Sequence, residues 1–377
     1  MIGQMKEVYV AFGEDPKDLI GILFEKIPWL KSFFKPNDEI LLKPNVLMPR
    51  ESESGATTDP LLVEQLIVEL RKRGIEKITI AEGAWVGADT SEAFERCGYK
   101  KLADDYRLDL VDLKRDRFLK VPVGIKNSTL KHIKIAKTIL DSSKIINLPV
   151  LKAHCQAKLT CGMKNFMGAI SDGEKRRFHR LDLDRCVFEL ATLIKPALNI
   201  CDAVIGDLTF EEGGTPVKFG RVYVSDDLLS LDSYSANTLG YDVDDIGYLK
   251  HYKDHFGLDS GYHLANLNEP TEIKDFKAID YSERFPFQIH PRNACCSCLA
   301  SIFLALEKKP EVSRDTAFHV GMNVEKEEID PEKTNVFVGN CNKKYKDLGH
   351  YVEGCPPLAR DVLDALFEQC NDHQQKN

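Results

Sequence analysis

The chain has 377 residues, 43% of them hydrophobic and 29% charged, a composition typical of a folded globular protein rather than a disordered one. Its 51 basic and 59 acidic residues give a net charge of −8, which disfavours a general nucleic-acid binder because neutralising phosphates requires a basic surface. No apolar run approaches the roughly 18 residues of a membrane-spanning helix, and no secretory signal opens the chain, so we expect a cytoplasmic protein without nucleic-acid or membrane partners.

Strand-like and helix-like patterns alternate over residues 1–240. Strands are expected at 7–12, 39–43, 78–83, 109–114, 118–123, 145–150, 199–207 and 221–227. Helices are expected between the first strand and residue 30, and at 60–73, 90–98, 182–195 and 228–240. This alternation indicates crossover connections between parallel strands. We therefore predict an α/β fold whose main domain, residues 1–240, is a mostly parallel sheet covered by helices.

The composition changes after this main domain. Residues 241–289 are polar and rich in tyrosine, with broken helical patterning, and are expected to form a connector or lid. Residues 290–377 hold a cysteine cluster, helical patterns at 299–309 and after Pro356, and strand patterns near 317–321 and at 336–340. We predict a small cysteine-rich α/β module there.

Eleven cysteines, an odd number, stand in a chain without an export signal, which favours metal binding or redox chemistry over a disulfide framework. Cys295 and Cys298 have the C-x-x-C spacing that lets two thiolates of one turn reach a single centre. Cys341 follows a predicted strand, and Cys355 precedes two prolines that suit the first turn of a helix. These four cysteines are the expected metal ligands, with Cys296 as an alternative to Cys295.

Four thiolates suit either Zn²⁺ or a [4Fe–4S] cluster. Structural zinc sites favour two C-x-x-C pairs, and this region has one. The Gly-Cys-Pro-Pro run at Cys355 resembles a ligand of the cluster-binding small subunits of hydrogenases and respiratory complex I, and a helix N-terminus favours an anionic cluster. We expect a [4Fe–4S] cluster, while zinc and unligated buried thiols are the alternatives.

A second group of polar residues follows the strand predicted at 145–150. Lys152, His154, Lys164 and Asn165 are expected to gather beyond its carboxyl end, where open α/β sheets form ligand crevices. Two ammonium groups, an imidazole and a carboxamide suit an anionic substrate, and His154 or His179 would transfer protons. The alternative is that the lysines lie on solvated faces and the histidines are structural.

Further polar residues are expected at the same crevice. Those assigned to cofactor binding with Asn165 are Lys43, Asn45, Thr57 and Thr58. Helix capping is an equally good explanation for the two threonines and the following Asp59. Asp202, Asp207 and Glu212 surround a glycine-rich turn, where solvated turn residues are favoured over a divalent-cation site. No P-loop or dinucleotide-binding fingerprint is present.

Several motifs together resemble domain-of-unknown-function family three-six-two, over roughly residues 40–245. They are KPN (43–45), TTDP (57–60), LPVLKAH (148–154), LTCGMKNFMGA (159–169), CDAVIGD (201–207), GGTPVKFG (213–220) and SDDLLSLDSYSANTLG (225–240). The resemblance implies an α/β domain in a redox setting, often in anaerobes and often fused to ferredoxin-like modules. This chain lacks the C-x-x-C-x-x-C-x-x-x-C-P ferredoxin run, which favours a single cluster.

The combination predicts an iron–sulfur redox enzyme or electron-transfer protein that acts on an anionic small molecule and takes electrons from a donor such as ferredoxin. A flavin would suit the same crevice, although no motif requires one. The alternative is a non-redox transferase, lyase or hydrolase that acts on an anionic substrate and carries a structural zinc site.

Overall fold

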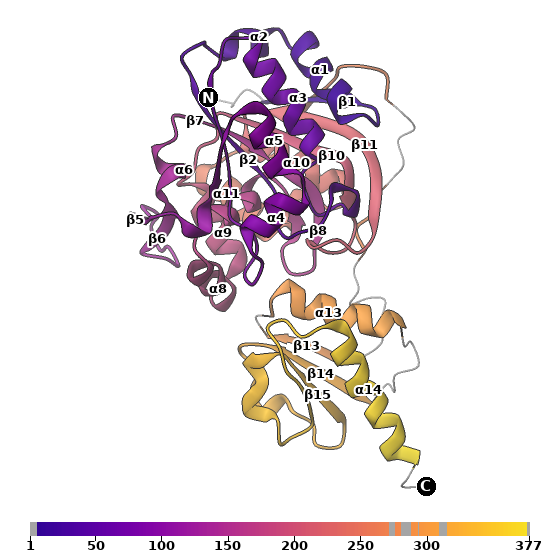
Figure 1. The fold of residues 1–377 in the computed structure, drawn as a ribbon. Coiled ribbons are helices and arrows are strands. Elements are labelled where there is room, and N and C mark those ends of the chain that lie inside the picture. The colour runs from indigo at the N-terminus through magenta and orange to yellow at the C-terminus, as the bar shows by residue number, and fades with distance from the viewer. Residues whose placement is uncertain (1–5, 271–275, 280–287, 293, 309–314, 375–377) are drawn as a thin grey trace. The chain divides into compact units, whose positions relative to one another are not determined.

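The computed structural model describes residues 6–270, 276–279, 288–292, 294–308 and 315–374. The chain divides into two compact units (Figure 1). Unit 1 comprises residues 1–178 and 182–278, and unit 2 comprises residues 179–181 and 279–377. The sequence predicted a connector over 241–289, whereas the structure places 241–278 within unit 1. None of the described helices is long and apolar enough to cross a membrane.

Unit 1 is built on a ten-stranded sheet with the order β12-β1-β11-β10-β7-β2-β3-β4, and β8 and β9 extend it beside β10. Its strands are β1 (Lys6–Phe12), β2 (Glu39–Pro44), β3 (Lys77–Glu82), β4 (Asp109–Asp112), β7 (Lys144–Leu148), β8 (Val150–His154), β9 (Lys158–Thr160), β10 (Leu198–Asp207), β11 (Pro216–Ser225) and β12 (Tyr262–Asn266). A separate hairpin is formed by β5 (Phe118–Pro122) and β6 (His132–Ala136).

Most neighbouring strands of the large sheet are parallel. The exceptions are β11, which is antiparallel to both β1 and β10, and the β8–β9 pair. The helices of this unit are α1 (Pro16–Lys26), α2 (Pro28–Phe33), α3 (Pro60–Arg71), α4 (Thr90–Arg96), α5 (Tyr99–Tyr106), α6 (Lys137–Asp141), α7 (Gly162–Asn165), α8 (Asp172–Arg180), α9 (Leu183–Ala191), α10 (Leu228–Thr238) and α11 (Gly247–Phe256).

Two apolar clusters, one on each face of the sheet, form the core of unit 1. Successive residues of β2 alternate between them: Ile40 and Leu42 pack with α1–α5, whereas Leu41 packs with the cluster that contains α6–α11. A strand buried on both faces reads as a continuous apolar run, which is why EILLK could be recognised as a central strand. The predicted helix-covered, mostly parallel α/β fold is confirmed.

Unit 2 is a four-stranded sheet in which every pair is parallel, with the order β13-β14-β15-β16. Its elements are β13 (Gln288–Arg292), α13 (Cys296–Lys308), β14 (Thr316–Gly321), β15 (Thr334–Val338), β16 (His350–Val352) and α14 (Ala359–Gln374). The predicted small α/β module is confirmed. Because all four strands run the same way, the segments that follow them lie at one edge of this sheet.

Candidate functional site

The candidate site of unit 1 lies beyond the ends of β8 and β2. Lys152 and His154 are on β8, which is buried along its length and pairs with β10. Lys164 and Asn165 are on α7, which begins just after β9. Short polar segments at strand ends are where open α/β sheets bind ligands. The structure brings the two lysines and the histidine of the sequence prediction into one buried cluster.

Lys152 is fully buried, and its ammonium donates to three neutral oxygens: Asn45 Oδ1 at 2.9 Å, Ala56 O at 2.8 Å and Glu211 O at 2.8 Å. These acceptors use all three N–H groups, and none of them is a carboxylate. Burial lowers the pKa of Lys152 to about 8, although Glu211 attracts its charge. The charge is thus solvated by the protein, and a bound anion would balance it.

Glu211 links the two lysines to His154, and the sequence analysis missed it. Its carboxylate contacts Lys164 Nζ at 2.6 Å and His154 Nε2 at 3.4 Å. Burial raises the pKa of Glu211, but its interactions with Lys164, His154 and Lys152 together outweigh burial and hold this pKa well below its usual range. An ionised carboxylate therefore stands beside Lys164 and His154, where a substrate anion was expected. The only sequence signal was its place before a glycine-rich turn that follows β10.

His154 is held as a neutral imidazole. Its Nδ1 accepts hydrogen bonds from the backbone N–H groups of Gln156 and Ala157, both at 3.0 Å. A ring nitrogen that accepts carries no proton, so the proton lies on Nε2, on the side of Glu211. Burial, followed by the charge of Lys164, lowers the pKa of His154. The side chain is suited to donate a hydrogen bond through Nε2 rather than to act as a base through Nδ1.

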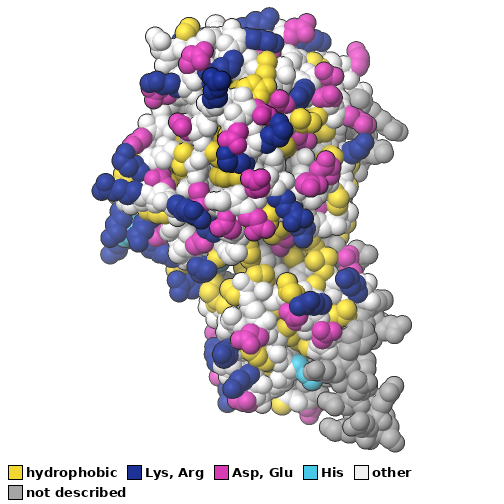
Figure 2. Space-filling model, viewed as in Figure 1, with side chains coloured by type: hydrophobic (Ala, Val, Ile, Leu, Met, Phe, Trp, Pro, Cys, Tyr) yellow, Lys and Arg dark blue, Asp and Glu magenta, His cyan; other side chains and the backbone are white. Residues whose placement is uncertain are grey.

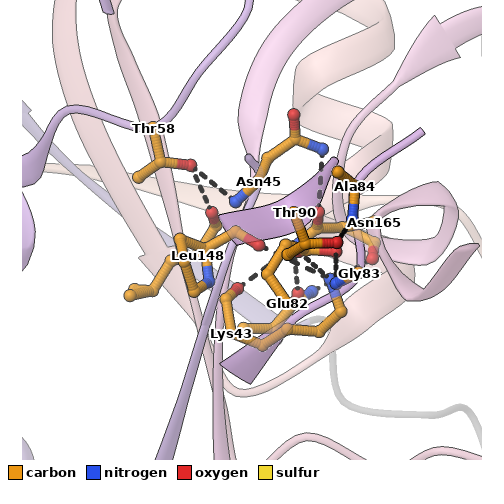
Figure 3. Close-up of polar contacts among 12 residues, drawn as sticks. Lys43, Asn45, Thr58, Glu82, Gly83, Ala84, Thr90, Leu148 and Asn165 are labelled. Atoms are coloured by element: carbon orange, nitrogen blue, oxygen red, sulfur yellow. Dashed lines mark hydrogen bonds and ion pairs between the residues drawn. The ribbon is translucent and has the colours of Figure 1, made fainter. Parts of the chain in front are cut away.

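Asparagine side chains connect Lys152 to the middle of the sheet. Asn45 Nδ2 donates to Asn165 Oδ1 at 2.9 Å (Figure 3), Asn165 Nδ2 donates to Asn147 Oδ1 at 2.8 Å, and Asn147 Nδ2 donates to Asn199 Oδ1 at 3.1 Å. All four are buried. Asn45 and Asn165, which the sequence assigned to cofactor binding, hold each other and Lys152 in place.

Lys43 forms a buried ion pair beside this chain of amides. Its Nζ lies 2.5 Å from Glu82 Oε2 (Figure 3). Burial lowers the pKa of Lys43 and raises that of Glu82. A Cβ at Gly168 would lie 1.7 Å from Glu82 Oε1, so only glycine fits against the pair. The Lys43 ammonium, predicted to bind a cofactor, is thus already paired with a carboxylate.

The two threonines hold the connection between β2 and α3. The Thr57 hydroxyl donates to Arg50 O at 2.8 Å, and the Thr58 hydroxyl donates to Leu148 O at 2.7 Å. Asp59 caps the N-terminus of α3. Hydroxyl protons directed at backbone oxygens do not bind an anion. These contacts favour the structural alternative over the predicted cofactor contact.

The carboxylates near the glycine-rich turn also have protein partners. Asp207 accepts five hydrogen bonds of 2.6–2.8 Å, from the backbone of Thr209, Phe210, Gly214 and Thr215 and from the Thr209 hydroxyl. Asp202 accepts from the backbone of Asp59 and Val204, and burial raises the pKa of Asp202 to about 7. Oxygens engaged by N–H and O–H donors disfavour a divalent cation here. Asp207 instead shapes the turn that carries Glu211.

His179 lies near the end of α8, and it is grouped with unit 2, whereas Lys152, His154 and Lys164 belong to unit 1. The sequence analysis assigned it to the site because it follows Lys164 at short range along the chain. Its role in proton transfer stays a prediction.

The candidate metal centre of unit 2 lies at the carboxyl edge of the small parallel sheet. Cys295 follows β13 and Cys298 is in the first turn of α13, while Cys341 follows β15 and Cys355 follows β16. Cys298 is buried, Cys295 is half-buried, and the other two thiols are exposed. The topology thus delivers all four predicted ligands to one edge.

Electrostatic coupling among these thiols indicates that they face a common space. The pKa of Cys298 is raised by its hydrogen bond with Cys295, by burial, and by the charges of Cys295, Cys355 and Cys341. Burial raises the pKa of Cys341, and the charges of Cys295 and Cys355 add to the effect. Within the part of the chain that the structure describes, no three His, Cys, Asp or Glu side chains are arranged to hold a metal ion. The thiols are therefore within electrostatic range but are not arranged as ligands.

Gly339 keeps the space around the Cys298 thiol open. It has φ +88°, and a Cβ there would lie 3.3 Å from Cys298 Sγ and 3.6 Å from Gly354 O. The ends of β15 and β16 are tied together, since Gly339 N donates to Val352 O at 2.9 Å and Asn340 N donates to Gly354 O at 2.8 Å. Four thiols at one edge of the sheet, beside the N-terminus of α13, are ligands of the kind that an iron–sulfur cluster or zinc requires.

The family model of a domain of unknown function, DUF362, matches residues 40–237, more than half of the chain. The chain belongs to this family. The resemblance inferred from the motifs between residues 40 and 245 is thus confirmed. The DUF362 match includes Lys152, His154, Lys164 and Glu211 and ends before the cysteines of unit 2.

The chain also resembles individual proteins, at low sequence identity. This DUF362 chain is 27% identical over 231 residues to thylakoid-associated protein sll1697 of Synechocystis sp., an alignment that covers 58% of the chain and 68% of that protein. The lactate racemase apoprotein of Thermoanaerobacterium thermosaccharolyticum aligns with a TM-score of 0.40 and 12% identity over 59% of this chain and 55% of the racemase. A protein of Thermotoga maritima aligns with a TM-score of 0.39 and 11% identity over 90% and 93% of the two chains.

Proposed function

We propose that this DUF362 protein is a cytoplasmic iron–sulfur redox enzyme that acts on an anionic small molecule and receives electrons from a donor such as ferredoxin. Cys295, Cys298, Cys341 and Cys355 would hold a [4Fe–4S] cluster, which supplies one-electron transfer when bound. The observation that supports the proposal is the parallel topology of the small sheet, which places Cys295, Cys341 and Cys355 after the carboxyl ends of three strands and Cys298 in the first turn of α13.

The anionic substrate is supported by the two buried ammonium groups of the unit 1 cluster, which lie among the carboxylates of Glu211, Glu212 and Asp207. Lys152 and Lys164 bring two ammonium groups, whereas Glu211 is the carboxylate in direct contact with Lys164. His154 adds a neutral Nε2–H donor on the same side. A carboxylate or phosphate group would find the Lys164 ammonium and the His154 donor there, with the Lys152 charge nearby, once it displaces Glu211 from Lys164.

Anaerobic purification followed by iron, sulfide and zinc quantitation tests the cluster. About four irons and four sulfides per chain, with iron–sulfur charge-transfer absorbance, are expected. Cys355→Ser should lose iron, because it removes an exposed ligand without disturbing a core. Cys97→Ser and Cys186→Ser, which alter buried thiols of unit 1, should keep it. Stoichiometric zinc without iron would favour the non-redox enzyme with a structural zinc site, and equal iron in all three variants would refute the ligand set.

Binding of sulfate to the purified holoprotein, measured by calorimetry, separately tests the proposal that unit 1 binds an anionic substrate. Lys164→Ala should weaken sulfate binding while leaving the iron content unchanged. Sulfate binding that is unaffected by this substitution would remove the anionic substrate from the proposal and leave the cluster untouched.

A further inference from the structure

Unit 1 carries a strongly basic hairpin, none of whose residues belongs to either candidate site. The hairpin comprises residues 114–137, which include β5 and β6, and holds eight Lys and Arg residues against one Asp, a net charge of +7 in a chain of −8. Figure 2 shows Lys and Arg side chains gathered at the edge of unit 1 where Figure 1 labels these two strands. The rest of the chain is therefore strongly acidic, and the positive charge is concentrated here.

Five of these basic side chains have no acidic partner. Lys114, Arg115 and Lys137 form ion pairs with nearby aspartates. The other five are exposed and form no ion pair with any residue in the described part of the chain; they are Arg117, Lys120, Lys126, Lys131 and Lys134.

The strands of the hairpin place two of these charges, Lys120 and Lys134, on the same face. Lys120 and Lys134 are directly opposite each other in the antiparallel register, and both are exposed. The alternate residues point the other way, and Ile133 and Ile135 are fully buried in the core. Like charges opposite each other destabilise a hairpin. The protein thus keeps a repulsive pair that contributes nothing to its packing.

We propose that this basic hairpin binds the surface of a membrane that contains anionic phospholipids. Lysines predominate, and as compact point charges they suit a diffuse layer of headgroups. The one Phe or Tyr of the hairpin, Phe118, packs against the core, so no exposed ring is offered for stacking on bases, which disfavours single-stranded nucleic acid. At about 0.1 M salt the acidic remainder of the protein is screened beyond roughly 10 Å, so it does not prevent contact.

The expectation of no membrane partner rested on the absence of a long apolar run and of a secretory signal. Neither of these criteria detects a local basic surface that binds lipid headgroups without entering the membrane. The inference does not depend on the cluster or on the anionic substrate.

Flotation with lipid vesicles tests the proposal with the full-length protein. Vesicles of phosphatidylcholine mixed with phosphatidylglycerol should bind it at low salt, whereas pure phosphatidylcholine vesicles should not. Lys120→Gln/Lys134→Gln should weaken binding roughly thirtyfold, since each removes a charge from the contact face. Lys100→Gln/Lys101→Gln on α5 removes the same net charge from exposed residues elsewhere and should bind like the wild type.

A thermal melt accompanies each variant. Removal of the repulsive Lys120–Lys134 pair should leave the melting temperature unchanged or higher, which separates loss of binding from loss of fold. Failure of the wild type to bind anionic vesicles at low salt, or equal binding by both double variants, overturns the proposal. Tighter binding to a single-stranded oligonucleotide than to the vesicles would reassign the face to nucleic acid.

Discussion

Glu211 contacts both buried lysines of the unit 1 cluster. Its carboxylate is the anion in contact with Lys164, while its backbone oxygen accepts from Lys152. An incoming anion must therefore compete with a side chain that belongs to the protein. Under the proposed function, Glu211 would be a positioning residue that keeps Lys164 paired until the anionic substrate binds.

Glu211→Gln is expected to raise the affinity for sulfate about tenfold, because the competing charge is removed and two ammonium groups remain. Without sulfate, the same variant should be destabilised by about 3 kcal/mol, since a buried ion pair loses one partner. Calorimetric titration and thermal melts with and without sulfate measure both effects. Glu174→Gln, which removes a buried carboxylate paired with Arg177, is the control and should not change sulfate affinity. Unchanged affinity in Glu211→Gln would contradict the assigned role.

Sulfate binding is expected to weaken as the pH rises through about 8. Burial lowers the pKa of Lys152 to about 8, so its ammonium is charged below that pH and loses its proton above it. Sulfate keeps its own charge over this range, so the titration reports on the protein. Lys152→Met should bind weakly with a flat profile. Lys175→Met alters another buried lysine whose pKa is lowered to about 8, but whose ammonium donates to Gly83 and Ala84, and should keep the wild-type profile.

The two sheets differ in the kind of side chain that lies at the carboxyl ends of their strands. The large sheet places charged side chains there and buries them under α7 and the turn after β10. The small sheet places thiols there, two of them exposed. Exposed thiols leave a bound cluster open to solvent, so air should bleach the iron–sulfur absorbance of the proposed holoprotein.

Gly339→Ala is expected to lower the iron content of the anaerobically purified protein while its circular dichroism is preserved. The added Cβ would lie 3.3 Å from Cys298 Sγ, and the residue would keep φ near +88°. Gly257→Ala is a control for a positive-φ alanine in open space, because Gly257 has φ +60° with nothing within 4 Å of the added carbon. Gly339 has ψ 158°, a region open essentially to glycine alone, so Gly339→Ala combines backbone strain with the contact at the Cys298 thiol. Equal iron in both would argue against Cys298 as a ligand.

The whole molecule consists of two units, each with its own sheet and, in unit 1, two large apolar clusters. Such units unfold as separate cooperative bodies when few contacts cross between them. The cysteines belong to unit 2 and the charged cluster belongs to unit 1. Each proposed site can therefore be perturbed without direct damage to the other.

Anaerobic scanning calorimetry is expected to show two transitions, of which chelation of iron lowers only one. Ligand-linked stabilisation acts on the unit that binds the ligand. Cys355→Ser should shift the same transition, which assigns it to unit 2. A single transition, or an equal shift of both after chelation, would contradict the independence of the two units.

Residues 39–43 illustrate what local pattern reveals. The apolar run EILLK, the Asp59–Pro60 helix start and the alternation of strands with helices led to the α/β fold, because burial and capping act over a few neighbouring residues. The motifs around Lys152 and Lys164 led to the family in the same way. The C-x-x-C spacing and the proline after Cys355 identified the cysteines as candidate metal ligands, because two ligands of one turn stand only a few residues apart in the sequence.

Only the tertiary structure revealed which charges meet. Glu211, distant in sequence from both Lys152 and Lys164, became their shared partner because β8 pairs with β10 and the turn after β10 folds back over it. Asn147 and Asn199 joined the amide chain because they lie opposite each other on the neighbouring strands β7 and β10. The antiparallel insertion of β11 was likewise invisible, because strand order depends on pairing between distant segments. Local sequence encodes periodicity and caps, whereas contacts across the sheet decide which polar groups share a proton or a charge.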